Sequence, residues 1–233
     1  MNGFKSRTMK HSNIKHIAIL VLMLCAAVGV QAQNVQFKVG GGFSSHYDGS
    51  SQLVGAFKVG VGYEWEFNQH WTFTPTLSVY GKGWKDPNQR VFVYDDSGNQ
   101  RFDEETGEPL TSIRNRTTTA NYVEVPLLFS YYFRTGESRY VVLSAGPYVA
   151  YGISGKQKTK GDAERPGSEK LYYEDKTFDE KGVHAFDAGV QVMAGYAFPS
   201  GFTLGVEADF GVTKFNKAGD RNVSALISLG YKL

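Results

Sequence analysis

An alternation of large apolar residues with small or charged residues recurs in eight stretches of this chain, from about Phe37 to the last residue. In the stretch 53–67, the odd positions from Phe57 to Phe67 are apolar and the even positions are small or charged. Successive side chains of a β-strand point to opposite faces, so each stretch would form a strand with one apolar face. A length of about 15 residues exceeds that of a soluble strand and suffices to cross a bilayer at a tilt. The pattern therefore predicts strands that span a membrane.

The connections between these stretches alternate in length. The second, fourth and sixth connections are tight turns at 68–70, 135–138 and 199–201, whereas two connections at the other end, 85–119 and 156–181, are long and charged. Bacterial outer-membrane barrels have an even strand number, short periplasmic turns and longer external loops. The sequence predicts an all-β fold, an eight-stranded antiparallel transmembrane β-barrel with up-and-down meander connections, as a single domain over residues 33–233. We expect its strands at 35–45, 53–67, 71–84, 120–134, 139–155, 182–198, 202–215 and 221–233.

The first 32 residues have the order of a secretory signal peptide. Four basic residues precede an apolar run of about 14 residues, and Val30-Gln31-Ala32 follows as a small-residue cleavage site. The run is short for a membrane-spanning helix, which disfavours the alternative of a retained N-terminal anchor. We expect a signal peptide over 1–32, cleaved near Ala32. Cys25 belongs to the apolar run, so the mature chain has no cysteine and no disulfide.

The charge of the mature chain differs from that of the whole sequence. The predicted signal peptide holds four of the 25 basic residues and none of the 23 acidic residues, so the mature chain is slightly acidic and no nucleic-acid partner is expected. Mean hydropathy is −0.33, which excludes a helical membrane protein. It does not exclude a barrel, because the hydropathy of the apolar face of each strand is offset by that of the polar face.

Many aromatic residues lie on the apolar face beside the short turns, where this end of the strands would meet a lipid–water boundary. A second, looser set is expected near the long loops: Phe43, Trp84, Tyr151, Phe186 and Phe215. The alternative fold is a soluble lipocalin-type barrel, whose outer face meets water. Its polar face should be dense in Lys and Glu, yet here that face is mostly Gly, Ser and Thr, which suits a narrow lumen.

Several of these strands resemble the PorT-like group of outer-membrane β-barrel proteins. The segments that carry the resemblance are YVEVPLLFSYYF at 122–133, GPYVAYGISG at 146–155, FDAGVQVMAGYAF at 186–198 and FTLGVEADFGVTKF at 202–215. The resemblance implies an outer-membrane location. Some members of the group serve protein secretion and many have no assigned activity. Leu233 departs from the group, where an aromatic final residue is commoner, and Tyr231 would supply that assembly signal instead.

Charged residues on the small-residue face would lie inside the barrel. We expect Lys58, Lys82 and Glu124 to meet at similar heights, with Glu124 between the two lysines. A second group of four residues is expected near the periplasmic end: Lys38, Glu64, Glu66 and Lys232. Buried charges must be paired or solvated, so a structural network of salt bridges is the favoured reading. A proton or ion path is the alternative, which a narrow lumen disfavours. The predicted lumen network comprises Lys38, Lys58, Glu64, Glu66, Lys82, Glu124, Asp187, Glu207, Asp209 and Lys232.

Enzymatic barrels of this size include lipid hydrolases and acyltransferases, which require a histidine at the rim. His46 and His184 fall near the external rim, with Ser44, Ser45 and Asp187 close in sequence. A hydrolase would need a His, a Ser and a carboxylate within hydrogen-bond reach. No recognisable lipase motif surrounds these residues. We therefore predict no catalytic residue and no enzymatic activity.

The two long loops carry most of the remaining polar residues. Asp95, Ser97 and Asn99 alternate as oxygen ligands do in a calcium loop, but the later bidentate Glu is missing, so a hairpin turn is favoured over a metal site. In the second loop, lysines at 156, 158 and 160 accompany several acidic residues, a mixed-charge surface that could face lipopolysaccharide phosphates. We predict no cofactor and no metal.

These features together predict a non-enzymatic protein of the bacterial outer membrane with a structural or surface-interaction role through its long external loops. The alternatives are a component of a protein secretion assembly and a lipid-modifying outer-membrane enzyme. The expected partners are outer-membrane lipid and lipopolysaccharide, with other envelope or secretion proteins as further candidates, and the protein is expected to be a monomer.

Overall fold

The computed structural model describes residues 34–47, 50–95, 97–161, 172–217 and 219–233. The predicted signal peptide, residues 1–32, lies outside these residues. Among the residues described, no helix is long and apolar enough to cross a membrane.

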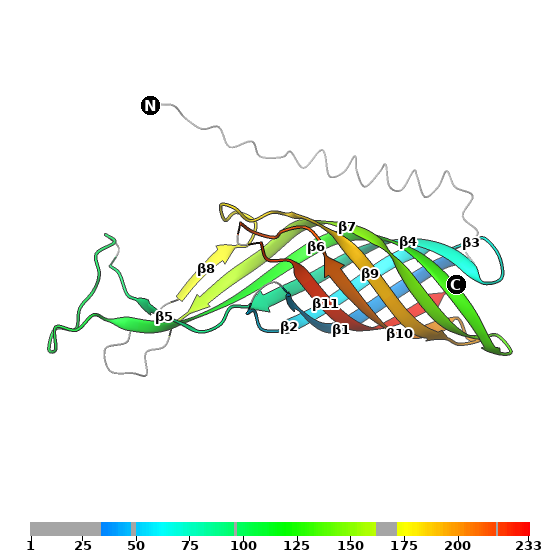
Figure 1. Cartoon of the computed structure of the whole chain (residues 1–233), viewed down its shortest axis with the longest axis horizontal. Coiled ribbons are helices and arrows are strands. Elements are labelled where there is room, and N and C mark those ends of the chain that lie inside the picture. Colours follow the sequence, from blue (N-terminus) through cyan, green and yellow to red (C-terminus); the bar gives the residue numbers. More distant parts are fainter. Residues whose placement is uncertain (1–33, 48–49, 96, 162–171, 218) are drawn as a thin grey trace, which may run out of the picture.

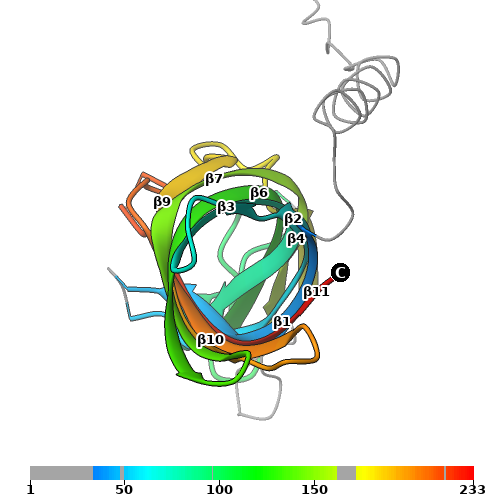
Figure 2. The same ribbon diagram turned by 90° about the vertical axis from the view of Figure 1, so that its right-hand side faces the viewer.

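Eight antiparallel strands close into a barrel (Figures 1 and 2). Each strand pairs with the next along the chain, and the first pairs with the last, so the predicted eight-stranded meander is confirmed. The barrel strands are β1 (Val35–His46), β2 (Val54–Tyr63), β4 (Trp71–Lys85), β6 (Thr111–Gly136), β7 (Arg139–Lys160), β9 (Phe186–Ala197), β10 (Phe202–Gly211) and β11 (Asn222–Lys232). The short strand β3 (Trp65–Glu66) prolongs the line of β2 and also pairs with β4.

The two faces of the wall have opposite chemistry, as the alternation predicts. On β2, Phe57 and Val59 are 50% and 53% exposed on the outside, whereas the intervening Lys58 is 1% exposed inside the barrel. Outward valines, leucines and phenylalanines recur on every barrel strand. A barrel of β-strands satisfies its backbone hydrogen bonds within the wall, so this apolar outer surface suits a bilayer.

Small residues fill the inner wall because the backbone of neighbouring strands is very close. A Cβ added to Gly42 would lie 2.0 Å from the carbonyl oxygen of Ala225, and one added to Gly146 would lie 1.9 Å from that of Leu127. Both glycines have the parity of the lumen-facing residues. A larger side chain at either position would therefore require the neighbouring strand to shift.

Aromatic side chains ring the end with the short turns, as predicted. Trp65 stacks on Phe73, and Trp71 meets the edge of Tyr131 on the outer surface. At the other end the prediction is partly wrong, since Trp84 and Phe215 are 5% and 4% exposed and lie inside the barrel mouth. Trp84 has the even, lumen-facing parity of its strand. The chain after β10 turns inward, and the Phe215 amide donates to the carbonyl of Asp220.

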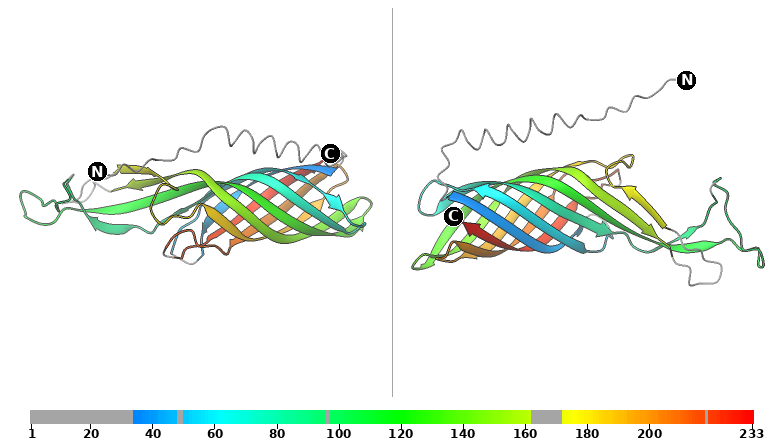
Figure 3. Two further views of the ribbon diagram at one scale, coloured as in Figure 1. Left: turned by 90° about the horizontal axis from the view of Figure 1, so that it is seen from above. Right: turned by 180° about the vertical axis from the view of Figure 1, so that it is seen from behind.

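The long external connections contain more sheet than expected. Strand β6 begins at Thr111 rather than at 120, and β7 continues to Lys160 rather than ending at 155. Two further strands flank these extensions, β5 (Gln89–Phe92) beside β6 and β8 (Tyr172–Lys176) beside β7. The result is a four-stranded sheet that projects beyond the barrel, here called the external arm (Figures 1 and 3). Threonine and isoleucine favour strands even where both faces are polar, so the charged composition of this region hid its strands.

Other strand boundaries differ by a few residues. The predicted strand 53–67 breaks at Glu64, whose amide donates to the carbonyl of Asn34. Strand β9 begins at Phe186 rather than at 182, and β10 ends at Gly211 rather than at 215. The favoured hairpin turn at 94–99 is confirmed, since the Asp95 carboxylate accepts hydrogen bonds from the amides of Ser97 and Asn99. These bonds hold the pKa of Asp95 below its usual value.

Candidate functional site

A buried charge network crosses the middle of the lumen. The Nζ atom of Lys58 lies 2.9 Å from Oε1 of Glu124, 3.0 Å from Oδ2 of Asp209 and 3.6 Å from Oε1 of Glu207. All four side chains are at most 2% exposed. They come from β2, β6 and β10, so the network ties opposite sides of the barrel together.

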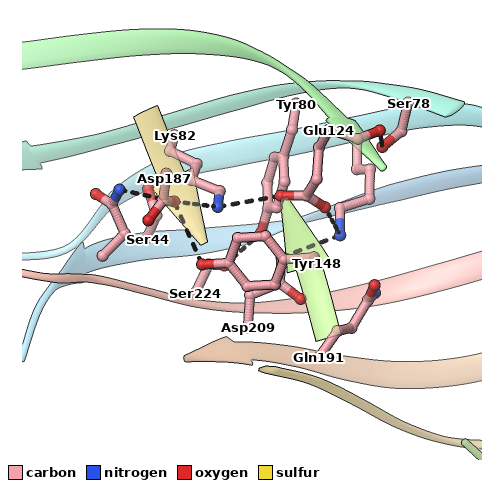
Figure 4. Close-up of polar contacts among 12 residues, drawn as sticks. Ser44, Ser78, Tyr80, Lys82, Glu124, Tyr148, Asp187, Gln191, Asp209 and Ser224 are labelled. Atoms are coloured by element: carbon pink, nitrogen blue, oxygen red, sulfur yellow. Dashed lines mark hydrogen bonds and ion pairs between the residues drawn. The ribbon is translucent and has the colours of Figure 1, made fainter. Parts of the chain in front are cut away.

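A second lysine completes this network. The Nζ atom of Lys82 lies 3.2 Å from Oε2 of Glu124 and 3.2 Å from Oδ2 of Asp187 (Figure 4). Glu124 therefore sits between Lys82 and Lys58. The two residues were expected at similar heights, but they are not opposite each other in the sheet. Lys82 is opposite Ala120, and Glu124 is opposite Ser78. The long lysine side chain spans this offset of four residues along β6.

Three tyrosines pack around the lysine ammonium groups. The Lys58 Nζ atom lies 4.2 Å from the ring centre of Tyr80, and the Lys82 Nζ atom lies 4.6 Å from the centres of Tyr80 and Tyr148. Tyr122 is 5.4 Å from Lys82. Aromatic faces attract cations at these distances, and more so where water is excluded. Sequence reasoning missed these tyrosines, although each has the lumen parity of its strand.

Hydrogen bonds from neutral side chains complete the network. The Tyr80 hydroxyl donates to Ser224, and the Gln191 amide donates to Glu207 at 3.0 Å. Asp187 accepts from Asn222 at 3.0 Å and from Thr213 at 2.9 Å. Buried carboxylates are costly unless they accept such bonds. These donors too were missed from the sequence, because the position of a neutral polar residue does not indicate which carboxylate it contacts.

Lys38 also belongs to this buried charge network, here called the central network, rather than to the periplasmic group in which it was expected. The central network thus comprises Lys38, Lys58, Lys82, Glu124, Asp187, Glu207 and Asp209. Its Nζ atom lies 2.6 Å from Oε2 of Glu207. In register, Lys38 is flanked by Gly60 and Gly230 on the two neighbouring strands. With no side chains beside it, the lysine can extend across the lumen to β10.

A separate polar cluster lies near the short turns. The Nζ atom of Lys232 is 2.6 Å from Oε1 of both Glu64 and Glu66. Gln36 and Tyr132 each donate to Oε2 of Glu64 at 2.7 Å. Glu64 is buried, but Glu66 is half exposed, so this cluster is in contact with water. Of the four residues expected here, the structure brings three together.

The central network separates two cavities. A cavity of about 540 Å³ extends from the short-turn end and is lined by Lys38, Glu64, Thr72, Thr76, Tyr132 and Ser144, among others. A smaller cavity of about 260 Å³ lies at the opposite mouth, lined by residues such as Trp84, Asp86, Arg116, Glu180 and Phe215. Between them lie the three lysines and four carboxylates of the central network, most of them almost fully buried.

Four of the rim residues considered for a hydrolase contact other groups. His46 is buried against Trp84, with ring centres 3.9 Å apart, and its Nδ1 atom is 3.9 Å from Asp220. The hydroxyls of Ser44 and Ser45 donate to backbone carbonyls, at 2.8 Å and 3.1 Å. The candidate carboxylate Asp187 instead pairs with Lys82. In the part of the chain that the structure describes, no three His, Cys, Asp or Glu residues are placed to hold a metal ion.

Residues 26–216 match the protein family described as "Outer membrane protein beta-barrel domain". No curated protein matches the chain.

The solved structures similar to this one include three outer-membrane barrels. The attachment invasion locus protein Ail of Yersinia pestis has 12% sequence identity and a TM-score of 0.39, covering 86% of this chain and 99% of Ail. The outer membrane enzyme PagL has 13% identity and a TM-score of 0.43, covering 85% of this chain and 99% of PagL. Neisserial surface protein A has 11% identity and a TM-score of 0.40, covering 85% of this chain and 96% of its own.

Proposed function

This chain belongs to the family of outer-membrane β-barrel domains and lies in the bacterial outer membrane, and on that premise we propose that it is a non-enzymatic surface-interaction protein. The barrel anchors and positions the external arm, and the arm contacts the partner. The observation that carries the proposal is the four-stranded sheet β5–β6–β7–β8, which extends beyond the last barrel pairing.

The arm is a continuation of two barrel strands. The last pairing of β4 with β6 joins Lys85 and Thr117, and the last pairing of β9 with β7 joins Phe186 and Tyr151. Beyond these points β6 and β7 pair with each other up to Asn115 and Lys160. A sheet rooted in a barrel is held in one orientation, which lowers the entropy lost on binding a partner.

The edge of the arm at β8 is suited to a partner that adds a strand. The Thr177 amide donates to the carbonyl of Gly155 on β7, at 3.2 Å. Amides alternate in direction along a strand, so those of Tyr172, Glu174 and Lys176 point away from β7. A row of outward amides and carbonyls is a template for an extended peptide. Tyr172 and Tyr173 are 57% and 54% exposed beside this row and would supply apolar contact.

The interior of the barrel supports an interaction role over transport. The central network lies between the two lumen cavities, and its lysines and carboxylates are paired with one another. The rim histidine His46 packs on an aromatic ring, and Asp187 is paired with Lys82, so neither favours hydrolysis. Membership of the PorT-like group, and with it a place in a secretion assembly, remains the alternative within the same class of interaction proteins.

Partner capture through the β8 edge is tested by proline at Glu174. Glu174→Pro removes an outward-facing amide and leaves the amides that pair with β7 in place, as proline on an edge strand allows. Glu174→Ala is the matched control, because it removes the same side chain and keeps the amide. Each variant carries a photo-crosslinking residue at Tyr173 and is expressed in intact cells of the source bacterium.

We expect a discrete crosslinked product for the parent and for Glu174→Ala, reduced at least tenfold in Glu174→Pro. Heat-modifiable gel mobility checks that every variant is folded. Equal products from Glu174→Pro and Glu174→Ala would exclude strand addition at this edge. A product that consists of secretion-machine subunits would select the secretion alternative.

A further inference from the structure

An exposed face of lysines lies at the root of the external arm, where the wall leaves the membrane. Three of these lysines alternate along β7, at 156, 158 and 160, and all three are exposed. Lys176 on β8 is opposite Lys156, and Lys85 on β4 is opposite Thr117, itself the neighbour of Lys158. Together the five residues are called the lysine face: Lys85, Lys156, Lys158, Lys160 and Lys176.

A bulge in β7 turns these lysines outward. Asn121 is opposite Ser154 and Tyr122 is opposite Gly152, so Ile153 is an extra residue in the pairing of β6 with β7. Before the bulge, odd residues such as Tyr151 are on the outer surface; after it, even residues are exposed while Gln157 and Thr159 are buried. An extra residue in a strand exchanges the two faces beyond it. The lysine face thus continues the lipid-facing surface of the barrel.

The lower end of this face, at Lys156, lies close to the height of lipid headgroups. Ile153 is the last apolar residue on the outer surface of β7 and is 57% exposed. A strand that rises about 3.3 Å per residue and tilts by about 40° places Lys156 roughly 8 Å above Ile153. The headgroup layer is roughly 5–8 Å thick on each side of the hydrocarbon core. Lys156 therefore lies at the outer edge of the headgroup layer. Lys158 and Lys160 lie further out, roughly 13 Å and 18 Å above Ile153, so their long side chains must extend toward the membrane to contact phosphate.

The face has an excess of positive charge. Within the described residues, Glu174 is the one carboxylate on the same face in register with these lysines, with its oxygens 2.5 Å from Lys156 and 3.6 Å from Lys158. The hydrogen bond from Lys156 keeps the pKa of Glu174 below its usual value, so this carboxylate stays charged. Asp179 adds a weak contact of 3.7 Å with Lys176. Among the described residues, these five lysines thus contact only two carboxylates.

We propose that the lysine face binds the phosphate groups of anionic outer-leaflet lipid, with the acyl chains against the apolar wall below Ile153. Two features combine to select such a lipid. The lysines are spaced two residues apart, about 7 Å, so a headgroup that carries more than one phosphate contacts two of them. The apolar band directly beneath accepts the chains of the same molecule. A soluble phosphate would contact the lysines but would make no use of the apolar band.

The proposal is tested with the full-length mature protein folded in detergent, by native mass spectrometry during titration with diphosphoryl lipid A. The test variant is Lys156→Gln/Lys158→Gln/Lys160→Gln. The matched control is Lys181→Gln/Lys214→Gln/Lys217→Gln, which removes three exposed lysines elsewhere on the external side. Dephosphorylated lipid A and inorganic phosphate serve as the second lipid probe and as a competitor.

We expect the test variant to weaken binding of diphosphoryl lipid A by roughly a hundredfold at low salt, at about fivefold for each lysine near an anionic surface. The control variant should stay within about twofold of the parent. Glu174→Gln should tighten binding, because it removes the acid that competes for Lys156 and Lys158. All differences should shrink as salt is raised.

Three results would each overturn the proposal. Equal affinity of the parent for dephosphorylated lipid A would mean that phosphate is not recognised. Release of lipid A by inorganic phosphate at comparable concentration would mean that the site takes free phosphate. Equal losses of affinity in the test and control variants would mean that the effect comes from net charge alone. If the triple variant fails to fold, the single variants Lys156→Gln and Lys158→Gln are measured in its place.

Discussion

Replacing Lys58 by methionine is expected to lower the free energy of unfolding by about 3–5 kcal/mol, the usual cost of removing one partner from a buried ion pair. Lys58 contacts three carboxylates in the central network, those of Glu124, Glu207 and Asp209. Without it, four buried carboxylates share two lysines. Methionine keeps most of the volume of the side chain, so the loss is electrostatic rather than a packing defect.

A second substitution should recover much of this stability. Asp209→Leu removes a carboxylate that pairs with Lys58 at 3.0 Å. In the double variant Lys58→Met/Asp209→Leu, Lys82 still pairs with Glu124 and Asp187, and Lys38 still pairs with Glu207. Each remaining lysine then keeps a carboxylate. Replacing both members of a buried pair by apolar residues is often close to neutral.

Joint replacement of Glu124 and Lys82 would not give the same recovery of stability. Each of them has a second partner, Lys58 and Asp187, that would be left behind. Urea unfolding in detergent, followed by Trp fluorescence, measures all four members of the Lys58–Asp209 cycle. A double variant that is no more stable than Lys58→Met would show that the two charges are not coupled.

Placing an arginine on the outer wall at Val59 is expected to cost about 2–4 kcal/mol, the penalty for a cation at mid-membrane depth on the lipid face of a barrel. Val59 is 53% exposed near the middle of the outward apolar run of β2. The arginine cannot reach the lumen, because alternate residues point to opposite faces of the wall. The penalty arises only if this surface is against lipid.

The matched control is Thr119→Arg, at an exposed position on the outer side of β6 opposite Lys156. Above the hydrocarbon core the same substitution should cost at most about 1 kcal/mol. Folding titrations into lipid vesicles measure both variants. Equal costs at the two positions would contradict the assignment of the apolar band.

The barrel could be predicted from the sequence because its chemistry is periodic. Apolar residues such as Phe57 alternate with small or charged residues such as Lys58 over most of each membrane crossing, because one face of the wall meets lipid and the other meets the lumen. The predicted strand boundaries were wrong where the strands extend beyond the membrane. The strands at 111–119 and 156–160 meet water on the outside, so polar residues occupy both faces and no alternation marks them.

The membership of the lumen network could be predicted from parity, but its contacts could not. Lys38 reaches Glu207 because glycines flank it on both sides, which depends on the register of three strands. Lys82 reaches Glu124 across an offset of four residues. The bulge at Ile153 decides which way the lysines of β7 point, and a single extra residue leaves no clear mark in the sequence.

Ion flux through vesicles that contain the folded protein tests the closed lumen most directly, when it is combined with the unfolding of Lys58→Met. Vesicles with the parent protein are predicted to hold a salt gradient as well as protein-free vesicles do, and Lys58→Met is predicted to unfold at lower urea. Discrete current steps in the parent, together with a Lys58→Met variant that unfolds like the parent but conducts differently, would contradict a structural network and assign these charges to transport.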